Sequence, residues 1–211
     1  MKDQFQNINT VVIVGAWNLA IFTPEWVRMN ILRDEDYPDV KILYPLNVLH
    51  SLRYSTGKFD FCIGDNRFMF TLTEKSDQAE HDMLNVISSI CQKLPHTPVS
   101  ALGINFVFET DKNINAVNAI DDTQSLVQSI GLDQTSVEIV RSYKRNDKET
   151  LNFKISKICE NKVKYDINNN YSIRTIQDIT EVLNVEDNII KSKREAALKM
   201  LKDVYQEELE G

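Results

Sequence analysis

Thr10–Phe22 reads TVVIVGAWNLAIF, and Val99–Glu109 reads VSALGINFVFE. Both stretches are rich in β-branched and aromatic residues, a composition typical of strands. A strand with one face in water alternates apolar and polar residues, whereas these two are apolar at both alternating sets of positions. We therefore expect two central strands of a sheet, each covered on both faces.

Helices and further strands are predicted after each apolar stretch, in a similar order. Thr23 and Pro24 are typical of a helix start, and Pro95 ends a later segment in which apolar residues recur every three or four positions. The elements expected after the first stretch are a helix over 23–32, β segments at 40–54, 58–63 and 67–73, and a helix over 76–94. Those expected after the second are a helix over 121–130, strands at 136–143, 150–158 and 162–167, and helical segments at 173–183 and 185–209.

This order predicts an α+β protein with an internal duplication. The two pseudo-repeated β-α-β-β-β-α halves would be residues 1–96 and 97–211, packed as one integrated unit with a long C-terminal helix. The topology resembles the TATA-binding-protein-like and helix-grip architectures, in which an antiparallel sheet carries long helices on one face. The resemblance lies in the order of the elements, so it implies no functional residues.

The composition is that of an ordinary globular protein with an acidic balance. Hydrophobic residues make up 42% of the 211 residues, and the formal net charge is −7. Bulk charge therefore gives no support for binding to nucleic acid or to an acidic membrane. The apolar run 11–22 has no basic flank and is shorter than the roughly 20 residues that span a bilayer, so no leader and no membrane span are expected. The predicted compartment is the cytoplasm of a bacterium or of a phage host.

No group of residues indicates catalysis, a metal or a cofactor. The three histidines lie far apart, and Gly57-Lys58 lacks the other residues of a phosphate-binding loop. The three cysteines, at wide spacing, predict buried free thiols rather than disulfides. An enzyme is therefore the less favoured interpretation, and a hydrolase would need Cys62, a histidine and a carboxylate to converge.

Basic residues gather in one part of this acidic chain. Residues 134–168 carry 8 basic and 5 acidic side chains, and the alternation of β residues places Lys154, Lys162 and Lys164 on one exposed sheet face. Such a face could contact phosphates or an acidic partner, although edge lysines also prevent strands from aggregating. The candidate contact residues are Arg141, Lys144, Arg145, Lys154, Lys162 and Lys164.

A surplus of large apolar residues indicates a protein interface. Trp17, Trp26 and Met29 belong to the first strand and helix, which hold more apolar side chains than one half can easily bury. Arg194 falls near the apolar stripe of the last helix, which a fully buried face would not favour. These four residues are the candidate interface.

The sequence therefore favours a non-enzymatic interaction or assembly protein. It would form a homo-oligomer or serve as a subunit of a larger complex, such as a phage or mobile-element system. Two alternatives stay open: a nucleic-acid-binding protein that uses the basic strands of 141–164, and a helix-grip module that holds a small apolar ligand between a long helix and its sheet.

Overall fold

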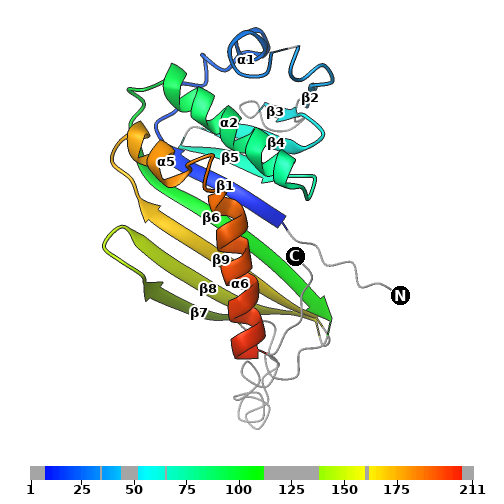
Figure 1. The fold of residues 1–211 in the computed structure, drawn as a ribbon, viewed down its shortest axis with the longest axis vertical. Coiled ribbons are helices and arrows are strands. Elements are labelled where there is room, and N and C mark those ends of the chain that lie inside the picture. Colours follow the sequence, from blue (N-terminus) through cyan, green and yellow to red (C-terminus); the bar gives the residue numbers. More distant parts are fainter. Residues whose placement is uncertain are drawn as a thin grey trace, which may run out of the picture. The chain divides into compact units, whose positions relative to one another are not determined.

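The computed structural model describes residues 8–33, 35–43, 52–64, 66–111, 138–159 and 162–205. Within them the chain is an α+β protein with four helices and one large antiparallel sheet (Figure 1). The strand order of this nine-stranded sheet is β2-β3-β4-β5-β1-β6-β9-β8-β7. The coarse fold class expected from the sequence is thereby confirmed.

Most of the predicted elements are present, with shifted ends. The strands are β1 (Ile8–Gly15), β2 (Lys41–Leu43), β3 (Arg53–Ser55), β4 (Phe59–Gly64), β5 (Arg67–Leu72), β6 (Val99–Asp111), β7 (Glu138–Lys144), β8 (Glu149–Cys159) and β9 (Lys162–Ser172). The helices are α1 (Pro24–Asn30), α2 (Asp77–Lys93), α5 (Ile176–Val182) and α6 (Ile189–Tyr205). The helix expected over 121–130 lies outside the described residues.

The two apolar stretches form β1 and β6, which are neighbours in the middle of the strand order, as predicted. The first stretch was expected to be one strand to Phe22, and this is wrong, because β1 ends at Gly15. A Cβ on Gly15 would lie 2.6 Å from the carbonyl oxygen of Pro98, so the chain passes too close to its neighbour for a larger residue. Cover on both faces is also incomplete, since Val14 is 36% exposed.

The chain divides into two compact units, each assembled from separate stretches of sequence. Unit 1 comprises residues 1–8, 105–169 and 193–211, and unit 2 comprises residues 9–104 and 170–192. Unit 2 therefore contains β1 to β5 with α1, α2 and α5, and unit 1 contains β7, β8 and most of β9 and α6.

The core of unit 2 is an aromatic cluster under α2. The Phe68 ring lies 5.2 Å from Trp17, 5.4 Å from Phe22 and 4.5 Å from Phe70, measured between ring centroids. Helix α2 starts where Ser76 accepts a hydrogen bond from the Ala79 backbone N–H, and its apolar stripe is buried.

The core of unit 1 lies between α6 and the strands β8 and β9 (Figure 1). Alternate residues of these strands are buried, among them Phe153 and Tyr165, and the Tyr205 ring at the end of α6 lies 5.6 Å from each of those two rings. The predicted alternation of this sheet is therefore confirmed. No described helix is both long and apolar enough to cross a membrane.

Candidate functional site

Strand β7 of unit 1 is the most exposed regular element that the structure describes. It stands at one end of the strand order, and among the described strands its neighbour is β8. Six of its seven residues are exposed, and the large apolar side chains of Val140 and Tyr143 are 63% and 47% exposed. An edge strand of this kind presents unpaired backbone groups on its outer side.

The pairing of β7 with β8 identifies which backbone groups face outward. Arg145 lies opposite Glu149 in the continued register and donates its N–H to the Glu149 carbonyl oxygen. Opposed residues in an antiparallel pair alternate between hydrogen-bonded and non-hydrogen-bonded positions. The even-numbered residues of β7 therefore direct their N–H and C=O groups away from β8. Val140 and Ser142 lie at the centre of this outer edge, which is free of any other described strand.

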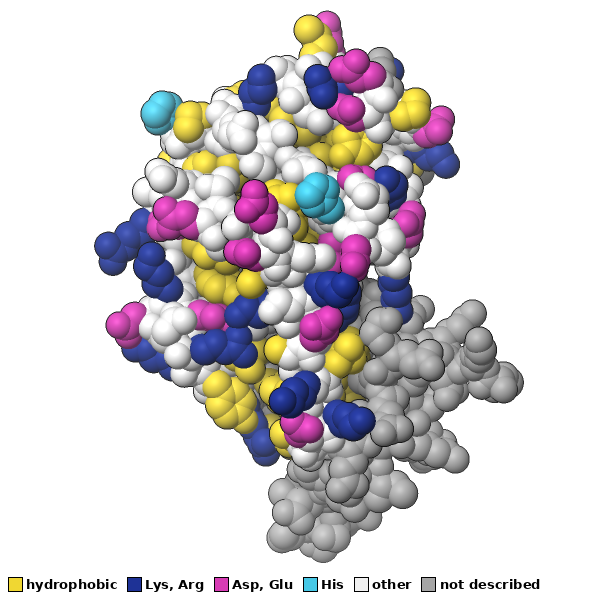
Figure 2. Space-filling model, in the orientation of Figure 1, with side chains coloured by type: hydrophobic (Ala, Val, Ile, Leu, Met, Phe, Trp, Pro, Cys, Tyr) yellow, Lys and Arg dark blue, Asp and Glu magenta, His cyan; other side chains and the backbone are white. Residues whose placement is uncertain are grey.

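An apolar groove of about 300 Å³ runs between α6 and the hairpin of β7 and β8. Leu151 and Phe153 line it from β8, and Met200 and Val204 line it from α6. Val204 is 59% exposed, so the groove opens to solvent along the helix. In Figure 2, yellow apolar side chains lie between dark-blue basic ones in this part of unit 1.

Three polar side chains border the groove: Arg141 and Tyr143 from β7, and Tyr205 from α6. Burial raises the pKa of Tyr205, and the nearby guanidinium of Arg141 opposes that shift. The Tyr205 hydroxyl is therefore protonated at neutral pH. Within the described residues, no acidic side chain lines the groove.

The predicted basic residues of the sheet face lie together, but each is close to a carboxylate. Lys154 pairs with Glu138 at 2.5 Å, Lys162 with Glu109 at 2.5 Å, and Lys164 with Asp166 at 3.1 Å. The hydrogen bond to Glu138 is the main reason that the pKa of Lys154 is raised. This sheet face therefore carries lysines that are paired with carboxylates, and it is not an uncompensated positive surface.

The β7–β8 hairpin carries the other predicted basic residues. Lys144 pairs with Asp147 at 2.6 Å, and Arg145 pairs with the buried Glu149 at 2.7 Å. Lys193 of α6 reaches the same Glu149 oxygen at 2.6 Å, so this carboxylate holds the hairpin and the helix together. Arg141 is the exception, because it forms no ion pair with any described residue.

A ladder of polar side chains crosses unit 1, and sequence reasoning missed it. Ser142 donates to Asn152 at 2.8 Å, Asn152 donates to Asn168 at 3.0 Å, and Asn168 donates to Asn105. Strand β9 continues to Ser172, whereas the sequence predicted an end at Ile167, and Asn168, the first residue past that predicted end, belongs to the ladder. The asparagine run at 168–170 favours a turn locally, but the Asn168 amide bonds to asparagines of the two neighbouring strands, Asn152 in β8 and Asn105 in β6.

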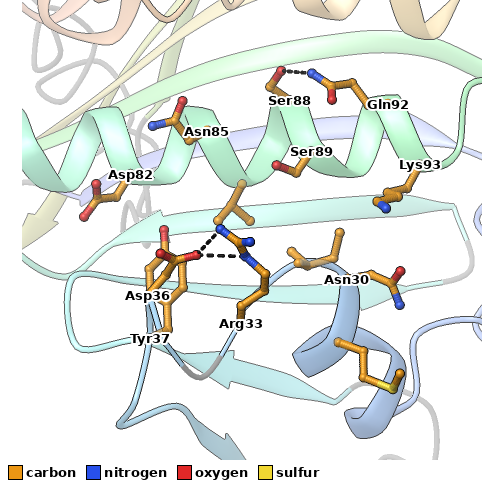
Figure 3. A pocket seen from close by; sticks show the side chains of 13 residues that line it. Asn30, Arg33, Asp36, Tyr37, Asp82, Asn85, Ser88, Ser89, Gln92 and Lys93 are labelled. Atoms are coloured by element: carbon orange, nitrogen blue, oxygen red, sulfur yellow. Dashed lines mark hydrogen bonds and ion pairs between the residues drawn. The ribbon is translucent and has the colours of Figure 1, made fainter.

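Unit 2 holds a larger and more polar cleft of about 660 Å³ between α2 and the segment that follows α1. Asp82, Ser89 and Lys93 point from α2 toward Arg33 and Asp36, which face each other across an ion pair of 2.8 Å (Figure 3). The lining includes two basic and two acidic side chains, so its formal charge balances.

The same cleft holds one strongly shifted hydroxyl. Burial, assisted by the Asp82 and Asp36 carboxylates, raises the pKa of Tyr37 to about 12. Tyr37 is therefore a neutral hydroxyl in the physiological range. The cleft offers hydrogen-bonding groups, but within the described residues no three histidine, cysteine or acidic side chains are placed to hold a metal ion.

The four predicted interface residues have different environments. Trp17 is 5% exposed and belongs to the aromatic core of unit 2. Trp26 is half-buried and its ring lies 5.3 Å from Phe22, whereas Met29 is 71% exposed at the rim of the polar cleft. Arg194 lies half-buried on α6, in unit 1.

The cysteine that the hydrolase alternative requires sits in the middle of β4. Cys62 is half-buried, and its pKa is raised chiefly by burial, which disfavours the reactive thiolate. Cys91 is buried in α2, and burial raises its pKa to about 12. The histidine at position 50 lies outside the described residues.

Comparison with known protein families finds no match for this chain, and comparison with curated proteins finds none either. Evidence for a function therefore comes from the groove, the cleft and the edge of β7.

Proposed function

We propose that this chain is a non-enzymatic interaction or assembly protein that binds another protein chain by strand addition to the free edge of β7. In this mode an extended segment of the partner pairs with the exposed edge of a sheet, and backbone hydrogen bonds supply much of the affinity. The partner strand would pair with the even-numbered residues of β7, whose N–H and C=O groups face outward.

The observation that carries this proposal is the accessibility of β7. Soluble proteins commonly protect a free edge with charged side chains. Of the three charged residues of β7, Arg141 borders the groove beside α6, and Glu138 and Lys144 are paired with Lys154 and Asp147. Val140 lies between them and exposes an apolar side chain that an added strand would cover.

The first test is the mass of the protein in solution, measured by light scattering at two salt concentrations, with and without nucleic acid. Backbone pairing and apolar contact depend weakly on salt, so we expect a dimer or larger assembly that persists at high salt. A strict monomer that also retains no protein partner from its host would contradict the proposal.

A proline at position 140 tests the edge itself. Val140→Pro removes one outward N–H but no hydrogen bond to β8, so the hairpin should remain folded while association weakens by about tenfold or more. The matched control is Val140→Thr, which keeps both the N–H and the β-branched shape. Equal association of the two variants would contradict strand addition at β7.

The finer fold assignment is part of this proposal. We infer two pseudo-repeated halves, of the TATA-binding-protein-like or helix-grip type, from the strand order. In each half the first strand neighbours the last: β1 lies beside β5, and β6 lies beside β9. An experimental structure in which the two halves superpose strand for strand would support the duplication.

A second candidate function is the binding of a small apolar ligand, and the groove beside α6 favours it. A volume of about 300 Å³ is at the lower end of the range of ligand pockets. A long helix forms one wall and a sheet forms the other, which is the arrangement that a helix-grip module would use. Native mass spectrometry of the purified protein tests for a retained ligand.

Nucleic-acid binding is the less supported alternative. The three lysines of the sheet face would have to give up their carboxylate partners to contact phosphates. Binding that appears only at low salt, and that is lost when Lys154, Lys162 and Lys164 are all changed to Glu, would favour this alternative over strand addition.

A further inference from the structure

We infer that the groove of unit 1 binds a small apolar molecule that carries one negative charge, such as an aryl or alkyl carboxylate. This inference rests on the second candidate function and specifies the chemistry of its ligand. It follows from three features of the groove: its apolar walls, the guanidinium at its border, and a lining that includes no acidic side chain among the described residues.

The walls select an apolar body of modest size. Phe153 and Leu151 form the sheet side, and Met200 and Val204 form the helix side. Methionine adapts its unbranched side chain to irregular shapes, so this wall can fit a flat ring or a short alkyl chain. Binding would remove from water the side chain of Val204, which is 59% exposed.

Arg141 supplies the charge preference. It stands opposite Phe153 in the β7–β8 register, which places the start of its side chain beside an apolar ring. The neighbouring cations Lys144, Arg145 and Lys193 each pair with a carboxylate, whereas Arg141 pairs with none among the described residues. A planar guanidinium binds a carboxylate through two parallel hydrogen bonds, and an apolar surrounding strengthens that contact.

The tyrosines at the border reinforce the preference for an anion. The raised pKa keeps Tyr205 protonated, so its phenol carries no negative charge that would repel an anion. Tyr143 contributes a second phenol on the β7 side. A cationic ligand would meet Arg141 with no compensating acid among the described lining residues, and a neutral ligand would cover a guanidinium without pairing it.

A matched pair of dyes provides the test. 8-Anilinonaphthalene-1-sulfonate is an apolar anion, and N-phenyl-1-naphthylamine has the same ring system without the charge. Fluorescence titration of the full chain should show binding of both dyes, with the anion bound about tenfold or more tightly than the neutral dye. Near-ultraviolet circular dichroism checks that each variant is folded.

Three variants locate the site. Arg141→Gln should remove the advantage of the anionic dye and leave the neutral dye unchanged. Val204→Glu should weaken both dyes, because it places a carboxylate in the apolar wall at an exposed position that tolerates substitution. Lys199→Gln removes an exposed cation of α6 that does not line the groove, and should change neither titration.

The outcomes distinguish a failure of the anion preference from a failure of the small-ligand function. Equal affinity for the two dyes, unchanged in Arg141→Gln, overturns the anion preference and leaves the small-ligand function standing. Absence of binding by both dyes, or titrations that Val204→Glu does not alter, overturns the groove as a ligand site altogether. A loss in Lys199→Gln as large as that in Arg141→Gln assigns the effect to the general charge of the surface and also overturns the inference. Strand addition at β7 is tested by association and is independent of these outcomes.

Discussion

In both unit 2 and unit 1 a sheet is covered by a helix, but the two units differ in the polarity and charge of their surfaces. In unit 2 an aromatic cluster around Phe68 fills the space beneath α2, and the cleft at its surface is polar with balanced charge. In unit 1 strand β7, at the end of the strand order, is exposed, the groove beside it is apolar, and Arg141 there lacks an ionic partner among the described residues.

We propose that this contrast separates a part of the chain that chiefly supplies stability from a part that offers a binding surface. Aromatic rings in mutual contact contribute large buried areas. Substitutions in the core of unit 2 should therefore lower the free energy of unfolding strongly. Among the described residues, the edge and the groove of unit 1 expose apolar side chains and backbone groups that have no strand partner, and a binding partner or ligand could cover them.

The largest expected effect is in the core of unit 2. Phe68→Ala should lower the free energy of unfolding by about 3–5 kcal/mol, because Phe68 is fully buried against four other rings. The contrasting variant in unit 1 is Tyr143→Ala, which should cost about 1 kcal/mol or less, since Tyr143 is 47% exposed. Urea denaturation followed by tryptophan fluorescence and by circular dichroism measures both.

The fluorescence probe sharpens this comparison, because both tryptophans, Trp17 and Trp26, belong to unit 2. Fluorescence therefore reports on unit 2, whereas circular dichroism reports on both units. Equal costs for Phe68→Ala and Tyr143→Ala would remove the distinction between a stabilising unit and a binding unit.

The next largest effect tests the buried ion pair of unit 1. Lys193→Met should cost about 2–4 kcal/mol, because it removes one of two cations from Glu149, whose side chain is 7% exposed. Lys191 lies two residues earlier in α6, in unit 2, and pairs there with Asp77, and both partners are exposed. Lys191→Met should therefore cost about 0.5 kcal/mol or less.

The same denaturation series measures these two lysine variants. The contrary result is that Lys193→Met lowers the free energy of unfolding no more than Lys191→Met does. That result would show that Arg145 alone compensates the Glu149 carboxylate, and it would contradict a stabilising contact between the hairpin and α6 through Lys193.

The smallest effect concerns the polar ladder. Asn168→Ala should cost about 1–2 kcal/mol, because its amide joins Asn152 to Asn105 across three strands. Asn170→Ala is the control at the next position on the same face of β9 and should cost less. Hydrogen exchange of the β8 and β9 amides should quicken in Asn168→Ala alone, and equal exchange in both variants would count against the ladder.

The sequence predicted the elements well where a local signal exists. The helix expected over 76–94 matches α2 with its caps at Ser76 and Leu94, because a capping side chain, an apolar period and a following proline act within a few residues of one another. The central position of β1 and β6 was likewise predicted from two-sided apolarity.

The predictions failed where distant residues decide the outcome. The strand expected to reach Phe22 ends at Gly15, because the Pro98 carbonyl approaches there and Trp17 turns into the core. Strand β9 continues past Ile167, where the Asn168 amide has partners in β8 and β6 that no local pattern specifies. Of the predicted site residues, Arg141 lines the groove, and the groove itself had no sequence signal.

The sequence by itself determined the α+β class, the alternation that places Phe153 and Tyr165 inward, and the helix boundaries near their caps. These features depend on residues close together in the chain and on periods of two or 3.6 residues. Only the tertiary structure decided that Lys154, Lys162 and Lys164 meet carboxylates, that Arg141 does not, and that β7 stands at the edge of the described sheet. The physical reason is that charge pairing and strand order depend on which distant segments fold against one another.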